Sequence, residues 1–173
     1  MELRKTVTLI EDTLIEDGRT LPQPIRRVAQ IAVVRNPLAG RIEENLEELV
    51  RDGEDLGRFL AKRAVELLDR GRITLLGKGA IIGEDGEPEH GQAILYPRFA
   101  AAVRETLGLD HASVLSEKLI AGPGAALKIR LRRIDSPLDS AEGVMELRVP
   151  GSPAPDEILV ALVVAGPSQA SSR

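Results

Sequence analysis

The chain has 173 residues, a formal net charge of -4 and an aromatic content of only 2%. This length predicts one domain. The acidic balance and the few aromatic side chains argue against nucleic-acid binding, which needs clustered cations or stacking platforms. The sequence has no cysteine, which excludes disulfides, thiolate nucleophiles and cysteine-ligated zinc. No apolar run is long enough for a membrane span or a signal peptide, so we expect a cytoplasmic protein without membrane contact.

Two strands are predicted near the N-terminus. Residues 5–20 are rich in Thr, Val and Ile, which favour a strand, and Glu16 to Gly18 form a turn signal within that segment. Residues 24–37 contain the apolar run Ile31 to Val34, which is typical of a strand covered on both faces. Pro37 is expected to end the second strand.

Two helices are predicted in the middle of the chain. Leucines at helical spacing predict a helix over residues 43–69, although two internal glycines speak against a single unbroken helix. A second helix is predicted over residues 97–107. Pro97 would lie in its first turn, where the missing N–H costs little, and Gly108 would end it.

The remaining segments predict strands and a single domain. Residues 72–83 predict a strand interrupted by glycine, residues 126–133 alternate apolar with basic side chains, and residues 157–165 form a nearly continuous apolar run. The order of strands and helices predicts one α/β domain over residues 1–165. Residues 166–173 are predicted to form a disordered tail.

The stretch from Gly77 to Gln92 concentrates five glycines, four carboxylates, one lysine and one of the two histidines. Its glycine spacing fits neither a dinucleotide fingerprint nor a phosphate loop. Glycines beside Lys78 would let backbone N–H groups approach an anion, or they form a twisted strand with a solvent-exposed lysine. Glu89 and His90 would make an acid/base pair, because imidazole titrates near neutral pH, or they belong to a surface turn.

Polar residues also mark the ends of two other predicted strands. A guanidinium and an amide at Arg35 and Asn36 would suit a carboxylate or phosphate ligand, or they form the turn into the following helix. Ser116 and Lys118 mark a second polar strand end, close to glycines.

A basic row follows in the last third of the chain, at Lys128, Arg130 and Arg132. Such a row is typical of a solvated sheet face, and it could also form ion pairs across strands or across a subunit boundary. The sequence contains neither a zinc-binding motif nor the G-x-S-x-G motif of serine hydrolases. We therefore predict neither a metal site nor a cofactor.

Three segments together resemble the amino acid synthesis family, a group of mostly bacterial proteins: Arg35 to Leu49, Gly77 to Phe99 and Ala154 to Ala165. The family is similar in fold to the Bacillus-type chorismate mutase. The resemblance therefore implies an α/β (α+β) domain with a mixed sheet and helices packed on one face. It also implies a ring of subunits, a trimer or a multiple of it, with pockets at subunit boundaries.

The resemblance and the residues together lead to two hypotheses about function. The first is a cofactor-independent enzyme of amino-acid metabolism that acts on a small carboxylated metabolite by acid/base chemistry of the isomerase or lyase type. The second is a non-catalytic metabolite-binding or accessory protein, and in a third interpretation the charged rows serve only ring assembly. Under the first, the catalytic residues are Lys78, Glu89 and His90, and the ligand-binding residues are Arg35, Asn36, Ser116 and Lys118.

Overall fold

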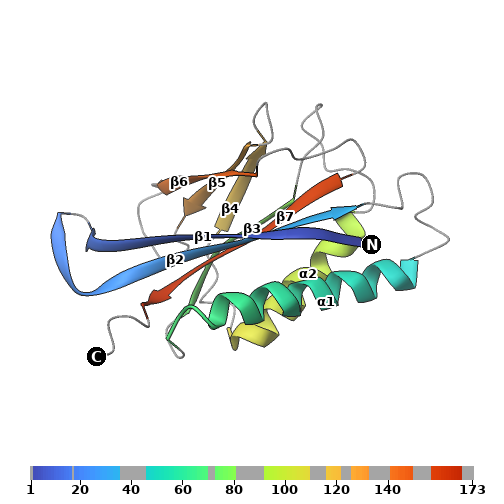
Figure 1. Ribbon diagram of the computed structural model, residues 1–173, viewed down its shortest axis with the longest axis horizontal. Coiled ribbons are helices and arrows are strands. Elements are labelled where there is room, and N and C mark those ends of the chain that lie inside the picture. The colour runs from blue at the N-terminus through green and yellow to red at the C-terminus, as the bar shows by residue number, and fades with distance from the viewer. Residues whose placement is uncertain are drawn as a thin grey trace.

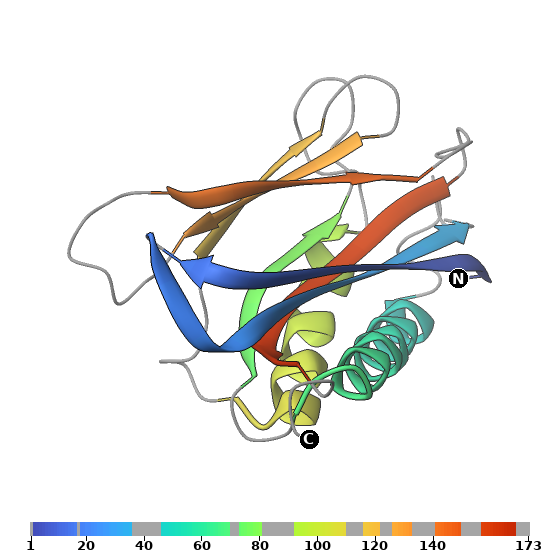
Figure 2. The same ribbon diagram turned by 60° about the vertical axis from the view of Figure 1, so that its left-hand side comes forward.

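Two sheets and a pair of helices make up the described part of the chain (Figure 1). In this computed structural model, the helices pack on one face of the larger sheet and the smaller sheet packs on its other face (Figure 2). The structure describes residues 2–16, 18–35, 46–69, 73–80, 92–109, 116–121, 126–132, 141–149 and 157–168.

A long hairpin forms two strands of the larger sheet. Strands β1 (Glu2–Glu16) and β2 (Arg19–Arg35) pair antiparallel. The turn between them holds Gly18 at a φ of 74°, a left-handed conformation that glycine adopts without steric cost. The predicted turn is therefore confirmed. Residues 28–34 are each at most 1% exposed, which confirms a strand that is covered on both faces.

The larger sheet has the strand order β1-β2-β7-β3, in which β7 (Glu157–Pro167) and β3 (Thr74–Ala80) come from distant parts of the chain. Every described pairing in this sheet is antiparallel. The resemblance implied a mixed sheet, and the described pairings differ from that expectation. The α+β class itself is confirmed.

The C-terminal end of the sheet extends past the predicted domain boundary. Strand β7 runs to Pro167, and Ser168 is 1% exposed and forms an isolated bridge with Leu68. The backbone N–H of Ser168 also donates a hydrogen bond to the carbonyl of Pro24 at 3.3 Å. Residues 166–168 thus belong to the sheet rather than to a tail, because their backbone is paired on the sheet. Residues 169–173 lie outside the described residues.

Helices α1 (Leu46–Val65) and α2 (Gln92–Leu107) cover one face of the larger sheet. The core on this side joins α1, α2 and β7 through side chains that are 0% exposed, among them Leu60, Phe99 and Leu162. Burial of such apolar surface is the main source of stability. Neither helix, within the described residues, is long and apolar enough to cross a membrane.

The second helix begins earlier than the sequence predicted and ends where it predicted. It starts at Gln92, so Pro97 lies inside the helix rather than in its first turn. Proline removes one backbone donor there, although its fixed φ suits a helix. At the other end Gly108 has a φ of 69°. Its N–H donates to the carbonyl of Glu105 and that of Leu109 donates to Arg104, which is the hydrogen-bond pattern of a Schellman cap.

A smaller sheet covers the opposite face of the larger one. Strands β4 (Ser116–Ala121), β5 (Ala126–Arg132) and β6 (Ala141–Arg148) pair antiparallel in the order β4-β5-β6. Leu147 of β6, at 0% exposure, packs with side chains of β2 and β7. The larger sheet is therefore covered on both faces, by helices on one and by a second sheet on the other.

The helix α1 is unbroken in spite of its glycines, and the contact with α2 explains one of them. Gly57 is buried, and a Cβ atom built on it would lie 2.7 Å from the backbone oxygen of Phe99 and 3.3 Å from the Cβ of Ala102. Glycine at this position therefore allows the two helices to approach closely.

We expect Gly57→Ala to destabilise the protein. Alanine would gain about 1 kcal/mol of helix propensity, but a forced overlap with backbone costs about 1–3 kcal/mol, and the oxygen of Phe99 cannot rotate away. Urea unfolding measures the difference. The control compares Lys62→Ala with Lys62→Gly at an exposed position of the same helix, where the alanine variant should be the more stable of the two. A stability of Gly57→Ala above that of wild type would contradict the close approach.

An ion pair joins the two strands of the hairpin where it leaves the rest of the sheet. Arg26 donates two hydrogen bonds to the carboxylate of Asp12, from Nε to Oδ1 at 2.8 Å and from Nη2 to Oδ2 at 3.1 Å. These hydrogen bonds lower the pKa of Asp12, against a smaller opposing effect of burial. The side chain of Asp12 is 46% exposed, so solvent screens the pair.

The lowered pKa of Asp12 predicts a loss of stability in acid. The pKa of Asp12 in the folded state lies below its value in the unfolded state. The ion pair therefore makes its full contribution to the free energy of unfolding above about pH 5, and this contribution is lost as the pH falls through the folded-state pKa. For an exposed pair we expect about 1 kcal/mol at most. Unfolding of Asp12→Asn and wild type, from neutral pH to below about pH 4, tests this. If the difference in free energy of unfolding between wild type and Asp12→Asn stays constant with pH, the lowered pKa of Asp12 is contradicted. The control is Asp55→Asn, which removes a carboxylate of an exposed ion pair on α1, with Arg58 at 3.2 Å, and leaves the hairpin unchanged.

Candidate functional site

The predicted site residues fall into two groups. Asn36, Glu89 and His90 lie outside the described residues, so their predicted roles stay predictions. The other four lie on described strands: Arg35 on β2, Lys78 on β3, and Ser116 and Lys118 on β4.

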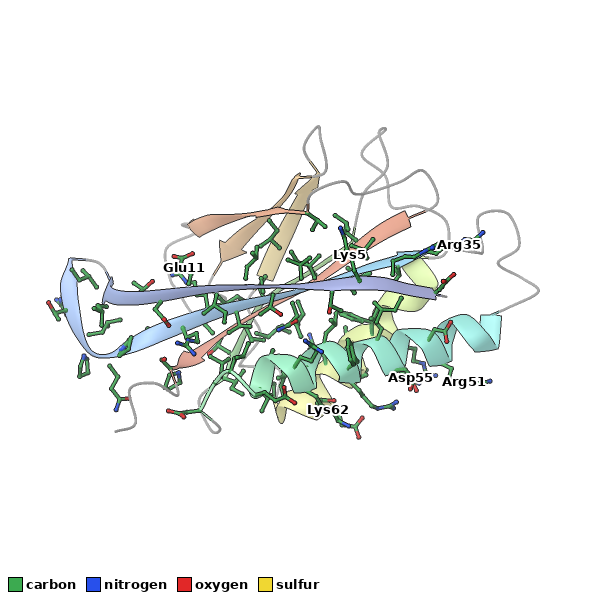
Figure 3. All side chains as sticks on the ribbon, in the orientation of Figure 1. Lys5, Glu11, Arg35, Arg51, Asp55 and Lys62 are labelled. Carbon is green, nitrogen blue, oxygen red and sulfur yellow. The ribbon has the colours of Figure 1, made fainter. Side chains whose placement is uncertain are left out.

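Arg35 is the last residue of β2 and lies between the two neighbouring strands (Figure 3). It is opposite Glu2 of β1 and Glu157 of β7 in the register. Its Nη1 atom lies 3.8 Å from Oε2 of Glu2, and its side chain is 49% exposed. Arg35 is thus a half-exposed guanidinium at a sheet end, and acidic positions flank it on both neighbouring strands.

Lys78 is far from Arg35 along the sheet. It is opposite Leu162 of β7, whereas Arg35 is opposite Glu157. Five residues of strand separate these positions by about 16 Å, and an odd number of residues places them on opposite faces. Leu162 belongs to the helix-side core, so Lys78 takes a register position on that face. Within one chain, the described backbone therefore does not bring Arg35 and Lys78 together.

The register of the smaller sheet does bring Ser116 and Lys118 together with the basic row. Ser116 is opposite Arg132 and Lys118 is opposite Arg130. Directly opposite residues of an antiparallel pair share a face of the sheet. By the same alternation, five cations share one face, which we call the cationic face: Lys118, Lys128, Arg130, Arg132 and Arg148.

The cationic face lies on the side of the smaller sheet away from the larger one. Leu147, which packs against the larger sheet, neighbours Glu146 and Arg148 in β6 and so takes the other face. Lys128 is opposite Glu146, so one cation of the face has an acidic partner position. Lys118 and Arg130, in contrast, are two basic residues at directly opposite register positions.

The sequence pattern indicated every cation of this face except Arg148, but it did not indicate that the two strands lie side by side. The alternation in residues 126–133 predicted a polar face, and Ser116 and Lys118 were predicted as ligand residues. The pairing of β4 with β5 joins the two sets, and alternation within one strand cannot reveal which strand lies beside it. The basic row at Lys128, Arg130 and Arg132 was interpreted as typical of a solvated face. The register shows in addition that Lys118 is opposite Arg130.

A separate cavity of about 890 Å³ lies between the C-terminal ends of the two helices. Its charged lining consists of one lysine, Lys62, and three acids, Glu66, Asp69 and Glu105. Helix C-termini carry a partial negative charge, so this cavity disfavours a carboxylate ligand. Among the described residues, no group of three His, Asp or Glu side chains is placed to hold a metal ion.

Comparisons with known proteins give a family and a related fold. Residues 3–173 match the family model described as amino acid synthesis. The chain is also similar to a crystal structure of a DUF1185 family protein from Silicibacter pomeroyi. The two are 33% identical with a TM-score of 0.62, over 95% of this chain and 99% of that one. No curated protein matches the sequence.

The opposed cations predict an unusual effect of substitution. We expect Lys118→Gln to raise the free energy of unfolding by roughly 0.2–1 kcal/mol, because it removes a like charge opposite Arg130. Lys128→Gln is the matched control and should lower stability, because Lys128 is opposite Glu146. Urea unfolding at low salt measures both. Equal effects of the two variants would contradict the register, and both effects should shrink at high salt.

Proposed function

Because the chain belongs to the amino acid synthesis family, we propose that it acts in amino-acid metabolism on a small carboxylated metabolite, as an enzyme that needs no cofactor. The family description names amino acid synthesis but neither a substrate nor a reaction. The choice of a carboxylated ligand comes from the charges of the described strands.

The opposed pair of Lys118 and Arg130 is the observation that carries this proposal. Two cations directly across a sheet repel each other, and a bound anion converts that repulsion into attraction. Carboxylates accept such charge-assisted hydrogen bonds well, and a guanidinium can bind one with two parallel bonds. Ser116, opposite Arg132, adds a hydroxyl that can donate to a second oxygen.

The chemical step is assigned to residues of the glycine-rich stretch. Glu89 or His90 would transfer a proton to or from the bound acid, as in an isomerase or lyase step. Lys78 would stabilise negative charge that develops in the transition state, and Arg35 and Asn36 would help to hold the acid. Because Arg35 and Lys78 lie on opposite faces within one chain, a site that uses both would combine residues from different copies.

Thermal stabilisation tests the ligand class. A panel of carboxylated amino-acid precursors and degradation intermediates is added to wild type and to the double variant Lys118→Gln, Arg130→Gln. A ligand at 100 times its dissociation constant should add about 2.7 kcal/mol to the stability of wild type, and the double variant should lose this gain. Arg51→Gln, an exposed change on α1, is the control that removes a positive charge elsewhere and should respond as wild type does. Equal stabilisation of the double variant, or none of wild type, would contradict the proposal.

The variant His90→Ala separates an enzyme from the alternative, a non-catalytic metabolite-binding or accessory protein. A bound acid should stabilise wild type and His90→Ala, whether the protein is an enzyme or a binding protein. If the protein is an enzyme, His90→Ala keeps the affinity for the acid and loses turnover by a factor of about 10²–10⁴, which is the usual contribution of a general acid or base. Undetectable turnover in wild type, with an acid that binds tightly, would favour the binding protein.

A further inference from the structure

Strand β1 forms a free edge of the larger sheet. In the strand order it has β2 on one side, and no strand among the described residues pairs with its other side. Alternate residues of an edge strand direct their backbone N–H and C=O groups away from the sheet, which makes the edge a template for another strand. Figure 1 shows β1 running the length of the sheet at this edge.

The exposed large hydrophobic residues of the described chain all lie on this edge strand: Leu3, Ile10, Leu14 and Ile15, at 45–59% exposure. Native proteins usually protect a long edge with charges, prolines or a short strand. An edge of 15 residues that carries four exposed apolar side chains is therefore a surface that a partner covers.

The charges of β1 are self-complementary about its centre. Between two register shifts, the pairing with β2 is regular from Lys5 to Thr13. Within this segment, Lys5 lies three residues before Thr8 and Glu11 three residues after it. Lys5 and Glu11 share one face, because they are opposite Val33 and Arg27 of β2. Figure 3 shows both projecting to the same side of the strand.

We propose that β1 pairs antiparallel with β1 of a second copy of this chain, around a two-fold axis at Thr8. This arrangement places Lys5 of each copy opposite Glu11 of the other, which gives two cross-strand ion pairs for one symmetry operation. Thr6 is then opposite Ile10, and Val7 is opposite Leu9. The exposed Ile10 is covered by a β-branched neighbour, a favourable pair on a sheet.

The same operation covers the other exposed side chains. The hairpin extends beyond β7, whose pairing with β2 begins only at Ile25, and this projecting arm carries Leu14 and Ile15. Antiparallel pairing about Thr8 carries the arm of one copy to the N-terminal end of the other, where Leu3 lies. A hollow of about 210 Å³ is found there, lined by four apolar residues and two acids: Leu3, Val34, Leu56, Phe59, Asp52 and Asp55.

A second copy fits this edge better than an unrelated partner does. The sequence of β1 itself supplies an acid opposite Lys5 and a base opposite Glu11 at the spacing that two-fold pairing requires, and the new pairs would add to the contact of Glu11 with Arg27. The two-fold contact is also distinct from the three-fold ring that the family resemblance implies. Where both contacts form, the assembly contains an even number of copies.

Charge reversal tests the pairing. Sedimentation velocity over a concentration series measures the mass of wild type, Lys5→Glu and Glu11→Lys, with circular dichroism to verify folding. Wild type should form an assembly with an even number of copies. Each single variant places like charges opposite each other at both ion pairs, so its mass should halve. Arg51→Glu on α1 reverses an exposed charge elsewhere and should leave the mass unchanged.

The decisive experiment is to mix the two single variants. Lys5→Glu and Glu11→Lys are complementary to each other at both ion pairs, so an equimolar mixture should recover the wild-type mass. The double variant Lys5→Glu, Glu11→Lys should recover it in one chain. A monomeric or odd-numbered wild type, a single variant that keeps the wild-type mass, or a mixture that fails to recover it would overturn the proposal.

Discussion

The pairing of β2 with β7 determines the rest of the architecture. The two strands are opposite each other at eleven consecutive positions, from Ile25 with Pro167 to Arg35 with Glu157. Their central residues are buried on both faces, and burial of this apolar surface requires a covering layer on each side. The helix pair supplies one layer through Leu60 and Phe99, and the smaller sheet supplies the other through Leu147.

Because the central strands β2 and β7 are buried, polar side chains are found at the edges and outer faces of the sheets. Among the described strands, β1 and β3 form the edges of the larger sheet, and only the face of the smaller sheet that carries Leu147 packs on the described core. The cationic face lies there and gathers charge that the buried strands cannot hold without paired partners. The free edge at β1 and the cationic face are thus two consequences of the same arrangement, and we propose that one binds a second copy of the chain and the other binds an anion.

Local patterns predicted the individual elements better than their association. The apolar run Ile31 to Val34 predicted a strand buried on both faces, and Gly108 predicted the end of a helix, because both signals depend on neighbouring residues alone. Gly57 was interpreted as a weakness of α1, since its contact with Phe99 joins two helices that are distant in sequence. The pairing of Lys118 with Arg130 and the separation of Lys78 from Arg35 were hidden for the same reason. The roles of Glu89 and His90 stay predictions.

Whether a carboxylate binds at the cationic face can be measured by a titration followed by nuclear magnetic resonance. Backbone amide signals of the assigned protein are recorded as a carboxylated metabolite that stabilises it is added. The account predicts shifts concentrated in β4 and β5, between Ser116 and Arg132, with little change at Lys62 to Asp69 beside the acidic cavity. Shifts concentrated at that cavity, or none in β4 and β5, would contradict the account.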